Sequence, residues 1–378
     1  MPFWRRRRRM TVASEPPAED LLVTEDTLRR NADGVLAITD RQIRGGIIIF
    51  RGALQVSPAR AMEMLTARFR PYGYTPFLRA DGAGVVVQAW PLAEVIEPPR
   101  FALALVLFLL TCVSTLFAGA IHAGVVDFGA APTWLLTGAP FAGTLIAILG
   151  VHEFGHYFTA RYYKAAVSLP YFIPAPPPFF LFGTMGAIIR IRSAVRDRTS
   201  LFDIAAAGPL AGLLIAIPAM VLGLAWSTLQ PMPTGPYLQT GDSVLTALLT
   251  TLCFGAIPAG MVVYTHPVAD AAWVGLFVTA LNLFPVGQLD GGRIAYALLG
   301  RHHRVVGVAA FGATLALGVA TWSLNWFVWA ALIFFFVGFH HSPPLDDVTP
   351  LSRGRRLTAA ACLVLFVLLL PPVPIQLG

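Results

Sequence analysis

The sequence is poor in charge, has a single lysine and carries no paired cysteines. Charged residues make up only 12% of its 378 residues, about half the share that is typical of soluble domains. Cys112, Cys253 and Cys362 each lie alone in an apolar stretch, so we expect neither a disulfide framework nor a thiolate metal site. With Lys164 as the only lysine, the net charge of +7 rests on arginine. Much of this arginine lies beside apolar segments, which argues against a nucleic-acid-binding surface.

Long apolar runs dominate the chain from Phe101 onward. Hydrophobic residues make up 56% of the sequence, and several runs reach the roughly 18 residues that a membrane-spanning helix needs. We therefore expect a polytopic α-helical membrane protein. The candidate spans are 101–121, 134–158, 201–227, 268–286, 305–323, 325–340 and 357–371.

The region before Phe101 is organised differently. Residues 1–20 are basic, then rich in Pro and Glu, which indicates a disordered leader, either near anionic lipid head groups or simply solvated. No apolar stretch follows the cluster Arg5–Arg9, so it does not resemble a cleavable signal peptide. Residues 21–96 predict a small soluble α+β domain with no catalytic constellation. Its expected elements are a strand at 45–54, a helix at 57–73 capped by Ser57, and a hairpin at 74–91 that turns at Asp81-Gly82.

Basic residues in the loops orient the spans. Segments 122–133 and 228–241 contain no Arg or Lys. Segment 161–198 instead carries Arg161, Lys164, Arg190, Arg192, Arg196 and Arg198. The positive-inside rule places segment 161–198 in the cytosol and the other two outside.

The stretch HEFGH, residues 152–156, puts ionisable groups at the end of an apolar run. His152 and His156 are one helical turn apart, about 6 Å of rise, so both imidazoles project from one face and can bind one zinc ion. Glu153 is the adjacent base, and the chemistry indicated is metal-assisted amide hydrolysis. On a soluble helix the same letters can make only ordinary side-chain contacts. Within a membrane helix, ionisable groups mark a functional site by default.

A catalytic zinc site needs a third protein ligand. Besides Glu153, the carboxylates after residue 100 are Asp127, Asp197, Asp203, Asp242, Asp270, Asp290, Asp346 and Asp347. Asp127, Asp242 and Asp270 are expected on the outer side, and three others lie in loops or turns. Asp203 is expected in the first turn of a helix, where it complements the amide dipoles. Asp290 remains as the candidate.

Two further segments depend on this topology. If 243–264 crossed the membrane once, Asp290 would lie on the wrong side, so we expect that segment to re-enter or to lie along the membrane; its Gly and Pro residues permit a bend. Segment 168–193 contains two extended pieces around Pro174–Pro178. They form either a re-entrant hairpin beside the site or a cytosolic loop, because irregular backbone at membrane depth requires protein or a wet cavity around it.

Four motifs, in this order, resemble the site-2 proteases, the intramembrane zinc metalloproteases of peptidase family M50. They are HEFGH, FGTMGAIIR (182–190), AAAGPLAG (205–212) and ALNLFPVGQLDGG (280–292). The resemblance covers residues 101–340 and looks closest to members with a cytosol-side active site, including the chloroplast-type relatives. No PDZ module or nucleotide-sensing module is recognisable, so regulation through such modules does not carry over.

The resemblance implies roles for individual residues. His152, His156 and Asp290 would bind one Zn²⁺ per chain, and Glu153 would be the catalytic base. Asn282, together with Gly183 and Gly186, would contact the substrate. A re-entrant β-hairpin-like segment near the active site would offer an open edge to an unwound substrate segment.

The expected function is an intramembrane zinc metalloprotease that hydrolyses peptide bonds within or next to transmembrane segments of membrane protein substrates. Two alternatives stay open. A metal-binding membrane transporter would show polar residues along several helices, and a non-catalytic scaffold would lack the base or a ligand. The expected partners are a transmembrane substrate and the lipid bilayer, with no nucleic acid. A bacterial or archaeal cytoplasmic membrane with the active site toward the cytosol fits best, with a plastid membrane as the alternative.

The expected domain organisation follows. It comprises the leader 1–20, the α+β domain 21–96, the membrane-embedded metalloprotease core 101–340, a cytosolic linker 341–356, and an additional membrane anchor and tail 357–378.

Overall fold

The chain forms two compact units, each described by itself. The computed structural model describes residues 18–82, 84–91, 100–125, 132–177, 180–235 and 237–377. The first unit combines Met1–Pro98 with two segments from further along the chain, Arg192–Leu201 and Ser342–Ser352; the second unit contains Pro99–Ile191, Phe202–His341 and Arg353–Gly378. The expected leader, up to residue 17, and the expected outer-side Asp127 lie outside the described residues.

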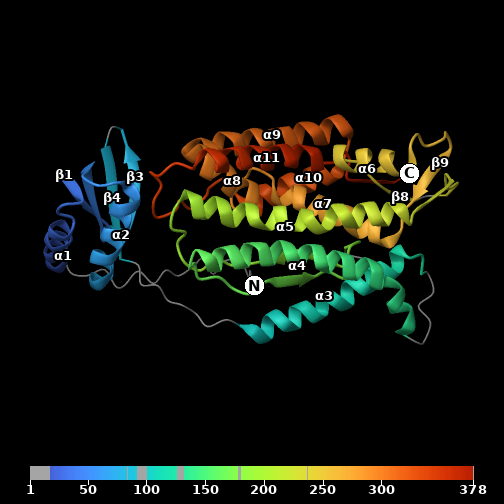
Figure 1. The fold of residues 1–378 in the computed structure, drawn as a ribbon, viewed down its shortest axis with the longest axis horizontal. Coiled ribbons are helices and arrows are strands. Elements are labelled where there is room, and N and C mark those ends of the chain that lie inside the picture. The colour runs from blue at the N-terminus through green and yellow to red at the C-terminus, as the bar shows by residue number, and fades with distance from the viewer. Residues whose placement is uncertain are drawn as a thin grey trace. The chain divides into compact units, whose positions relative to one another are not determined.

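The first unit is an antiparallel sheet with helices (Figure 1), strand order β1-β2-β4-β3. Its elements are α1 Ala18–Asn31, β1 Leu36–Arg44, β2 Ile47–Leu54, α2 Pro58–Phe69, the 3-10 turn Arg70–Tyr72, β3 Thr75–Asp81 and β4 Gly84–Trp90. The hairpin β3–β4 lies where the sequence predicted it, with Gly82 at φ 56°. Ser57 is the N-cap residue of α2, but its side chain makes no capping hydrogen bond, so that prediction was wrong.

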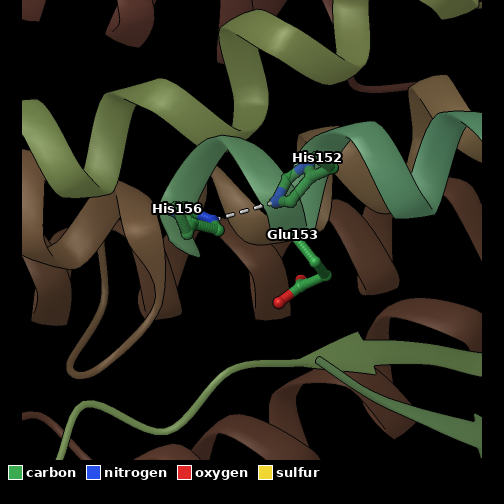
Figure 2. Close-up of side chains that lie close together, drawn as sticks. All are labelled: His152, Glu153 and His156. Atoms are coloured by element: carbon green, nitrogen blue, oxygen red, sulfur yellow. Dashed lines mark hydrogen bonds between the residues drawn. The ribbon is translucent and has the colours of Figure 1, made fainter. Parts of the chain in front are cut away.

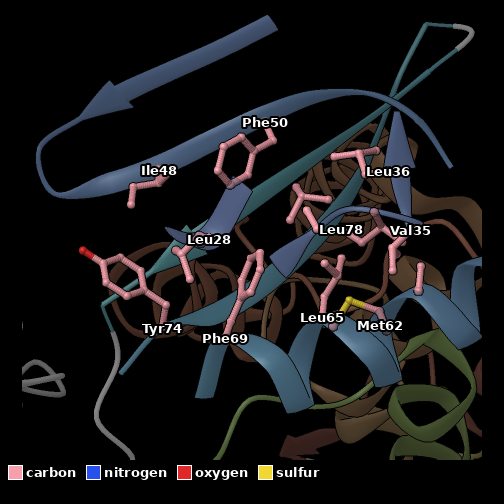
Figure 3. Close-up of a cluster of buried hydrophobic side chains, with 14 of the residues drawn as sticks. Leu28, Val35, Leu36, Ile48, Phe50, Met62, Leu65, Phe69, Tyr74 and Leu78 are labelled. Carbon is pink, nitrogen blue, oxygen red and sulfur yellow. The ribbon is translucent and has the colours of Figure 1, made fainter. Parts of the chain in front are cut away.

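The core of this unit lies between the sheet and α2. Burial alternates along β2, as expected of a strand with one covered face, and buries Ile48 and Phe50 completely. They belong to the same buried cluster as Leu65 and Phe69 of α2 (Figure 3). The α+β class predicted for this region is therefore confirmed.

Two short segments extend the sheet beyond β3. The N–H of Leu78 donates to the carbonyl of Leu345 (2.7 Å), and the N–H of Asp347 donates back to Leu78 (3.1 Å). On the far side, the N–H of Leu345 donates to Val195 (2.9 Å). Strand β3 is thus covered by backbone from 345–347, which is itself paired with 195–197, instead of presenting an open edge.

The second unit is mainly helical. Its elements are α3 Phe101–His122, the 3-10 segment Pro132–Gly138, α4 Ala139–Tyr162, β5 Tyr171–Pro174, β6 Thr184–Ile188, α5 Arg198–Ala225, β7 Thr228–Pro231, β8 Leu238–Thr240, α6 Val244–Phe254, β9 Met261–Tyr264, α7 Pro267–Asn282, α8 Asp290–Leu299, the 3-10 turn Gly300–His302, α9 His303–Thr321, α10 Leu324–Leu332, the π segment Ile333–Val337, α11 Arg353–Leu369 and β10 Ile375–Leu377. The first four residues of α5 belong to the first unit.

Among the described residues, four helical segments are long and apolar enough to cross a bilayer. They are Phe101–His122, Thr133–Tyr162, Arg198–Ala225 and Asp290–Thr321. The expected spans at 268–286 and 325–340 correspond to shorter apolar helices, Pro267–Asn282 and Leu324–Val337.

The sequence predicted that segment 243–264 does not form one spanning helix, and the structure agrees. Helix α6 has 11 residues and ends at Gly255, which has φ 67°. The chain then forms β9, which pairs antiparallel with β7. Eleven residues are about half of what a spanning helix needs.

Helix α4 lies in the middle of the elements that carry the sequence motifs. It packs against α3 and α7, and α5 runs alongside it (Figure 1). Strands β5 and β6 form the predicted two-stranded hairpin, which packs against α3. Helix α11 packs against α6, α7 and α8, and its Phe366 ring lies 5.0 Å from that of Phe284.

Candidate metal centre

Helix α4 buries both histidines and the glutamate of HEFGH. Pro140 lies in its first turn, where a missing N–H costs nothing, and the apolar sequence that follows continues the helix to Tyr162. His152 and His156 are each 3% exposed and Glu153 is 5% exposed. Figure 2 shows the two imidazoles on the same side of the helix. The i, i+4 spacing therefore has the effect expected from the sequence.

Asp290 lies beside the two imidazoles, although it is 134 residues from His156 in the chain. It is the first residue of α8. Its Oδ2 lies 3.1 Å from Nε2 of His156 and 3.5 Å from Nε2 of His152. The two Nε2 atoms are 3.2 Å apart. Three donor atoms from α4 and α8 thus converge on one point.

These separations fit a tetrahedral zinc ion. Zinc–nitrogen and zinc–oxygen bonds of about 2.0–2.1 Å in a tetrahedron require ligand atoms to be about 3.3 Å apart. The three observed separations, 3.1, 3.2 and 3.5 Å, bracket that value. Two imidazoles and one carboxylate are also a common donor set for catalytic zinc, with one position left for water or substrate.

A backbone carbonyl fixes the tautomer of His156. Nδ1 of His156 lies 2.7 Å from the carbonyl oxygen of Ile204 in α5. Because a carbonyl only accepts, Nδ1 carries the proton, and Nε2 is left with a lone pair for a metal. Ile204 is 1% exposed, so water does not replace this acceptor. This acceptor cannot be predicted from the sequence, because any residue supplies a backbone carbonyl.

Glu153 faces a different direction from the histidines. Figure 2 shows its carboxylate pointing away from α5, toward the strands drawn in green. Ile189, which directly follows β6, interacts electrostatically with this carboxylate through its backbone. Carboxylate and imidazole ligand atoms lie within 4.8 Å of one another. The carboxylate therefore lies beside the donor atoms, on the side of the hairpin.

Helix α5 packs directly on the two imidazoles. A methyl group at Gly208 would lie 2.5 Å from Cδ2 of His156 and closer still to two other ring atoms, whereas one at Gly212 would lie 3.2 Å from Nδ1 of His152. The absence of side chains at these two glycines therefore lets α5 approach the pair of candidate ligands closely.

The comparisons with known proteins match this part of the chain. Residues 140–324 match the model of peptidase family M50. The chain is thus similar to peptidase family M50 over about half of its length. M50 is the family of the site-2 proteases that the four motifs resemble. This match and the four long apolar helical segments together support a multi-pass membrane protein.

Curated relatives extend the similarity beyond the M50 segment. The chain is 31% identical over 371 residues to "Probable zinc metalloprotease EGY2, chloroplastic" of Oryza sativa subsp. indica, covering 89% of this chain and 63% of that protein. It is 30% identical over 374 residues to the protein of that name from Arabidopsis thaliana, covering 93% and 65%. It is 33% identical over 250 residues to "Probable zinc metalloprotease EGY1, chloroplastic" of Arabidopsis thaliana, covering 62% and 43%. The chain thus spans less than two thirds of the length of these relatives. No solved structure matches it significantly.

The M50 segment contains every candidate site residue, but the structure brings only some of them together. Nδ2 of Asn282, at the end of α7, lies 3.3 Å from Nε2 of His152, inside the site. Gly183 and Gly186 instead shape the hairpin, with φ 74° and 94°. The carbonyl of Gly183 accepts a hydrogen bond from Ser114 of α3 (2.6 Å). Their hydrogen bonds thus lie within the hairpin and with α3, and not with the histidines.

One carboxylate was placed wrongly by the sequence argument. Asp203 was expected in the first turn of a helix, but α5 begins at Arg198 and so puts Asp203 in the second turn. Its partner there is Arg355 of α11, with both donor–acceptor distances 2.8 Å. Arg355 lies outside the M50 segment, and no sequence pattern pairs these two residues, which are 152 positions apart.

Proposed function

We propose that this protein is an intramembrane zinc metalloendopeptidase that hydrolyses peptide bonds within or next to transmembrane segments of other membrane proteins. The observation that carries the proposal is the convergence of three donor atoms at tetrahedral spacing, next to a carboxylate that is not needed as a donor. The M50 match supports the same reaction class. The names of the chloroplast relatives agree with it.

His152, His156 and Asp290 would hold one zinc ion. When bound, zinc supplies Lewis-acid polarisation of a carbonyl and makes a water molecule acidic near pH 7. The protein's contribution is to keep both Nε2 atoms unprotonated and aimed at one point. The Ile204 carbonyl does this for His156.

Glu153 would act as general base and then as general acid. Its carboxylate takes the proton of the attacking water and gives a proton to the leaving amide nitrogen. The carboxylate points toward the strands of the hairpin (Figure 2), so a substrate segment paired with that hairpin would lie beside the base.

Asn282, Gly183 and Gly186 would handle the substrate. The Asn282 side-chain amide, beside His152, would donate to a substrate carbonyl near the metal. The hairpin β5–β6 is a two-stranded sheet, and the proposal has it re-enter the membrane region and accept an unwound substrate segment as an added strand. The two glycines give that hairpin the backbone bends it needs.

The active-site end would face the side of the arginine-rich loop 161–198, which is the cytosol in a bacterial or archaeal cytoplasmic membrane. The chloroplast relatives support a plastid membrane as the alternative. Neither the transporter nor the scaffold alternative is favoured, because the M50 segment keeps the base and all three candidate ligands.

The test compares purified wild type with Glu153→Gln in proteoliposomes that contain single-span substrates. Glutamine keeps the size of the side chain, and Glu153 is not one of the three proposed ligands, so zinc content should stay near one per chain. Cleavage should fall by about 10²–10⁴-fold, as expected for loss of a general base. Glu63→Gln, an exposed carboxylate in α2, is the matched control. Equal cleavage by wild type and Glu153→Gln, or no zinc in wild type, would contradict the proposal.

A further inference from the structure

Three polar side chains join three helices near the end of α4. Nε and Nη2 of Arg355, in the first turn of α11, donate to Oδ1 and Oδ2 of Asp203 in α5, both at 2.8 Å. The hydroxyl of Tyr163, which directly follows α4, donates to Oδ2 of the same carboxylate. Asp203 therefore accepts hydrogen bonds from α11 and from the end of α4 at the same time.

The Arg355–Asp203 pair has the two-point geometry of a strong ion pair. A guanidinium that donates two parallel hydrogen bonds to one carboxylate fixes both position and orientation, which a single lysine contact does not. The hydrogen bonds to Asp203 raise the pKa of Arg355 above its usual value. Burial, with the Asp203 carboxylate beside it, raises the pKa of Tyr163 to about 12. Tyr163 thus remains a donor over the whole range in which a protease is assayed.

The cluster lies one peptide unit from the contact that orients His156. Asp203 is followed by Ile204, whose carbonyl accepts from Nδ1 of His156. Tyr163, the residue directly after α4, comes seven positions after His156, which places it two helical turns further along the same face. Helices α4 and α5 are therefore joined twice on this face, by His156 to Ile204 and by Tyr163 to Asp203.

Between α4 and α5 the packing is close. A methyl group at Gly155 would lie 2.7 Å from the carbonyl of Ala207, so the helices touch through their backbones at small residues. The imidazoles of His152 and His156 lie against Gly212 and Gly208 in the same interface, so the register of the two helices sets the surroundings of both rings. A sliding motion of α5 would carry the Ile204 carbonyl away from His156.

We propose that Tyr163, Asp203 and Arg355 are positioning residues that hold α5 in register on α4, so that Ile204 keeps His156 ready to bind the metal. We call these three residues the clamp. The inference rests on the proposed function, since it concerns the metal site. It assigns a role to α11, a helix outside the M50 segment, in the assembly of that site.

The test measures zinc retention against a competing chelator in the purified full chain, apart from proteolysis. Asp203→Asn and Arg355→Gln should each weaken zinc binding by about 10–100-fold, the effect typical of removing an outer partner of a metal ligand. Arg355→Lys should fall between these variants and wild type, because it keeps the charge but loses the two-point geometry. Tyr163→Phe removes one hydroxyl and should have the smallest effect. Arg353→Gln, an exposed arginine two residues earlier, is the matched control and should bind zinc like wild type.

A double mutant separates this role from a general loss of stability. If Asp203 and Arg355 act as one unit, the double mutant Asp203→Asn/Arg355→Gln should bind zinc about as weakly as either single mutant, since effects within one network are not additive. Additive losses, or lower thermal stability with unchanged zinc affinity, would overturn the inference. Zinc-free wild type would instead overturn the proposed function, so the two failures are distinguishable.

Discussion

Replacing Gly208 by alanine tests how closely α5 packs on the candidate metal ligands. In the structure the new methyl carbon would lie 2.5 Å from Cδ2 of His156 and nearer still to Nε2 and Cε1. Carbon atoms in contact are normally about 3.5–4.0 Å apart, so the ring must move by about 1 Å or more. Ligand distances at a zinc site tolerate only about 0.2 Å. The substitution therefore displaces a candidate ligand without changing its chemistry.

The size of the effect follows from the cost of overpacking. Forcing an extra methyl group into a packed site costs about 1–3 kcal/mol. With no flexible neighbour to yield, we expect the upper end, about 3 kcal/mol, which weakens zinc binding by about 100-fold. A methyl group at Gly212 would lie 3.2 Å from Nδ1 of His152 and needs a shift of only tenths of an ångström. Gly212→Ala should therefore cost about 1 kcal/mol, or roughly fivefold.

The assay is zinc affinity by chelator competition, with Gly143→Ala as control. Gly143 lies in α4 like the histidines, and a methyl group there has nothing within 4 Å. This variant should bind zinc like wild type and be slightly more stable, because alanine is the better helix former. If Gly208→Ala keeps wild-type affinity, or if Gly143→Ala loses as much, the reasoning from α5 packing is refuted.

Three further predictions concern the metal, the orientation and the clamp. The unfolding free energy of zinc-free wild type should be about 2.7 kcal/mol lower than that of wild type in free zinc at 100 times Kd. Calorimetry should find no such difference between the two conditions for Asp290→Ala. An impermeant amine reagent should modify exposed Lys164, the only lysine, from the cytosolic side alone; Lys164→Arg gives the background, and labelling from the outer side would contradict the orientation. Because the pKa of Tyr163 is raised from 10.0 to about 12, its stabilising contact is complete below pH 10 and lost toward pH 12. The melting difference between wild type and Tyr163→Phe should shrink over that window, and a constant difference would contradict it.

Local spacing made part of the site predictable from the sequence. The i, i+4 histidines needed only helix geometry, and Asp290 was reached by excluding the other carboxylates. Contacts that depend on the direction of a side chain or on a backbone acceptor could not be predicted from the sequence. Ser57 took the N-cap position without making the capping bond, and the acceptor for His156 is a carbonyl that any residue could supply.

Elements with weak patterns were also missed. Strand β1 contains Asp40, Arg41 and Arg44, residues that occur in strands less often than β-branched ones, and it forms because β2 pairs along its whole length. Helix α1 has a single apolar residue, Leu28, in its second half and was not expected. In both segments, tertiary contacts determine the secondary structure that local residue propensity does not specify.

The connection between β6 and α5 belongs mostly to the first unit. It runs from Ile189, which directly follows β6, to the start of α5 and includes Arg192–Leu201. In the first unit, Val195 and Arg196 accept backbone hydrogen bonds from 345–346, and Arg198 pairs with Asp347 at 2.9 Å. A segment fixed in this way has fewer conformations than a free loop, so less entropy opposes its ordering. The sheet of the first unit therefore orders this connection.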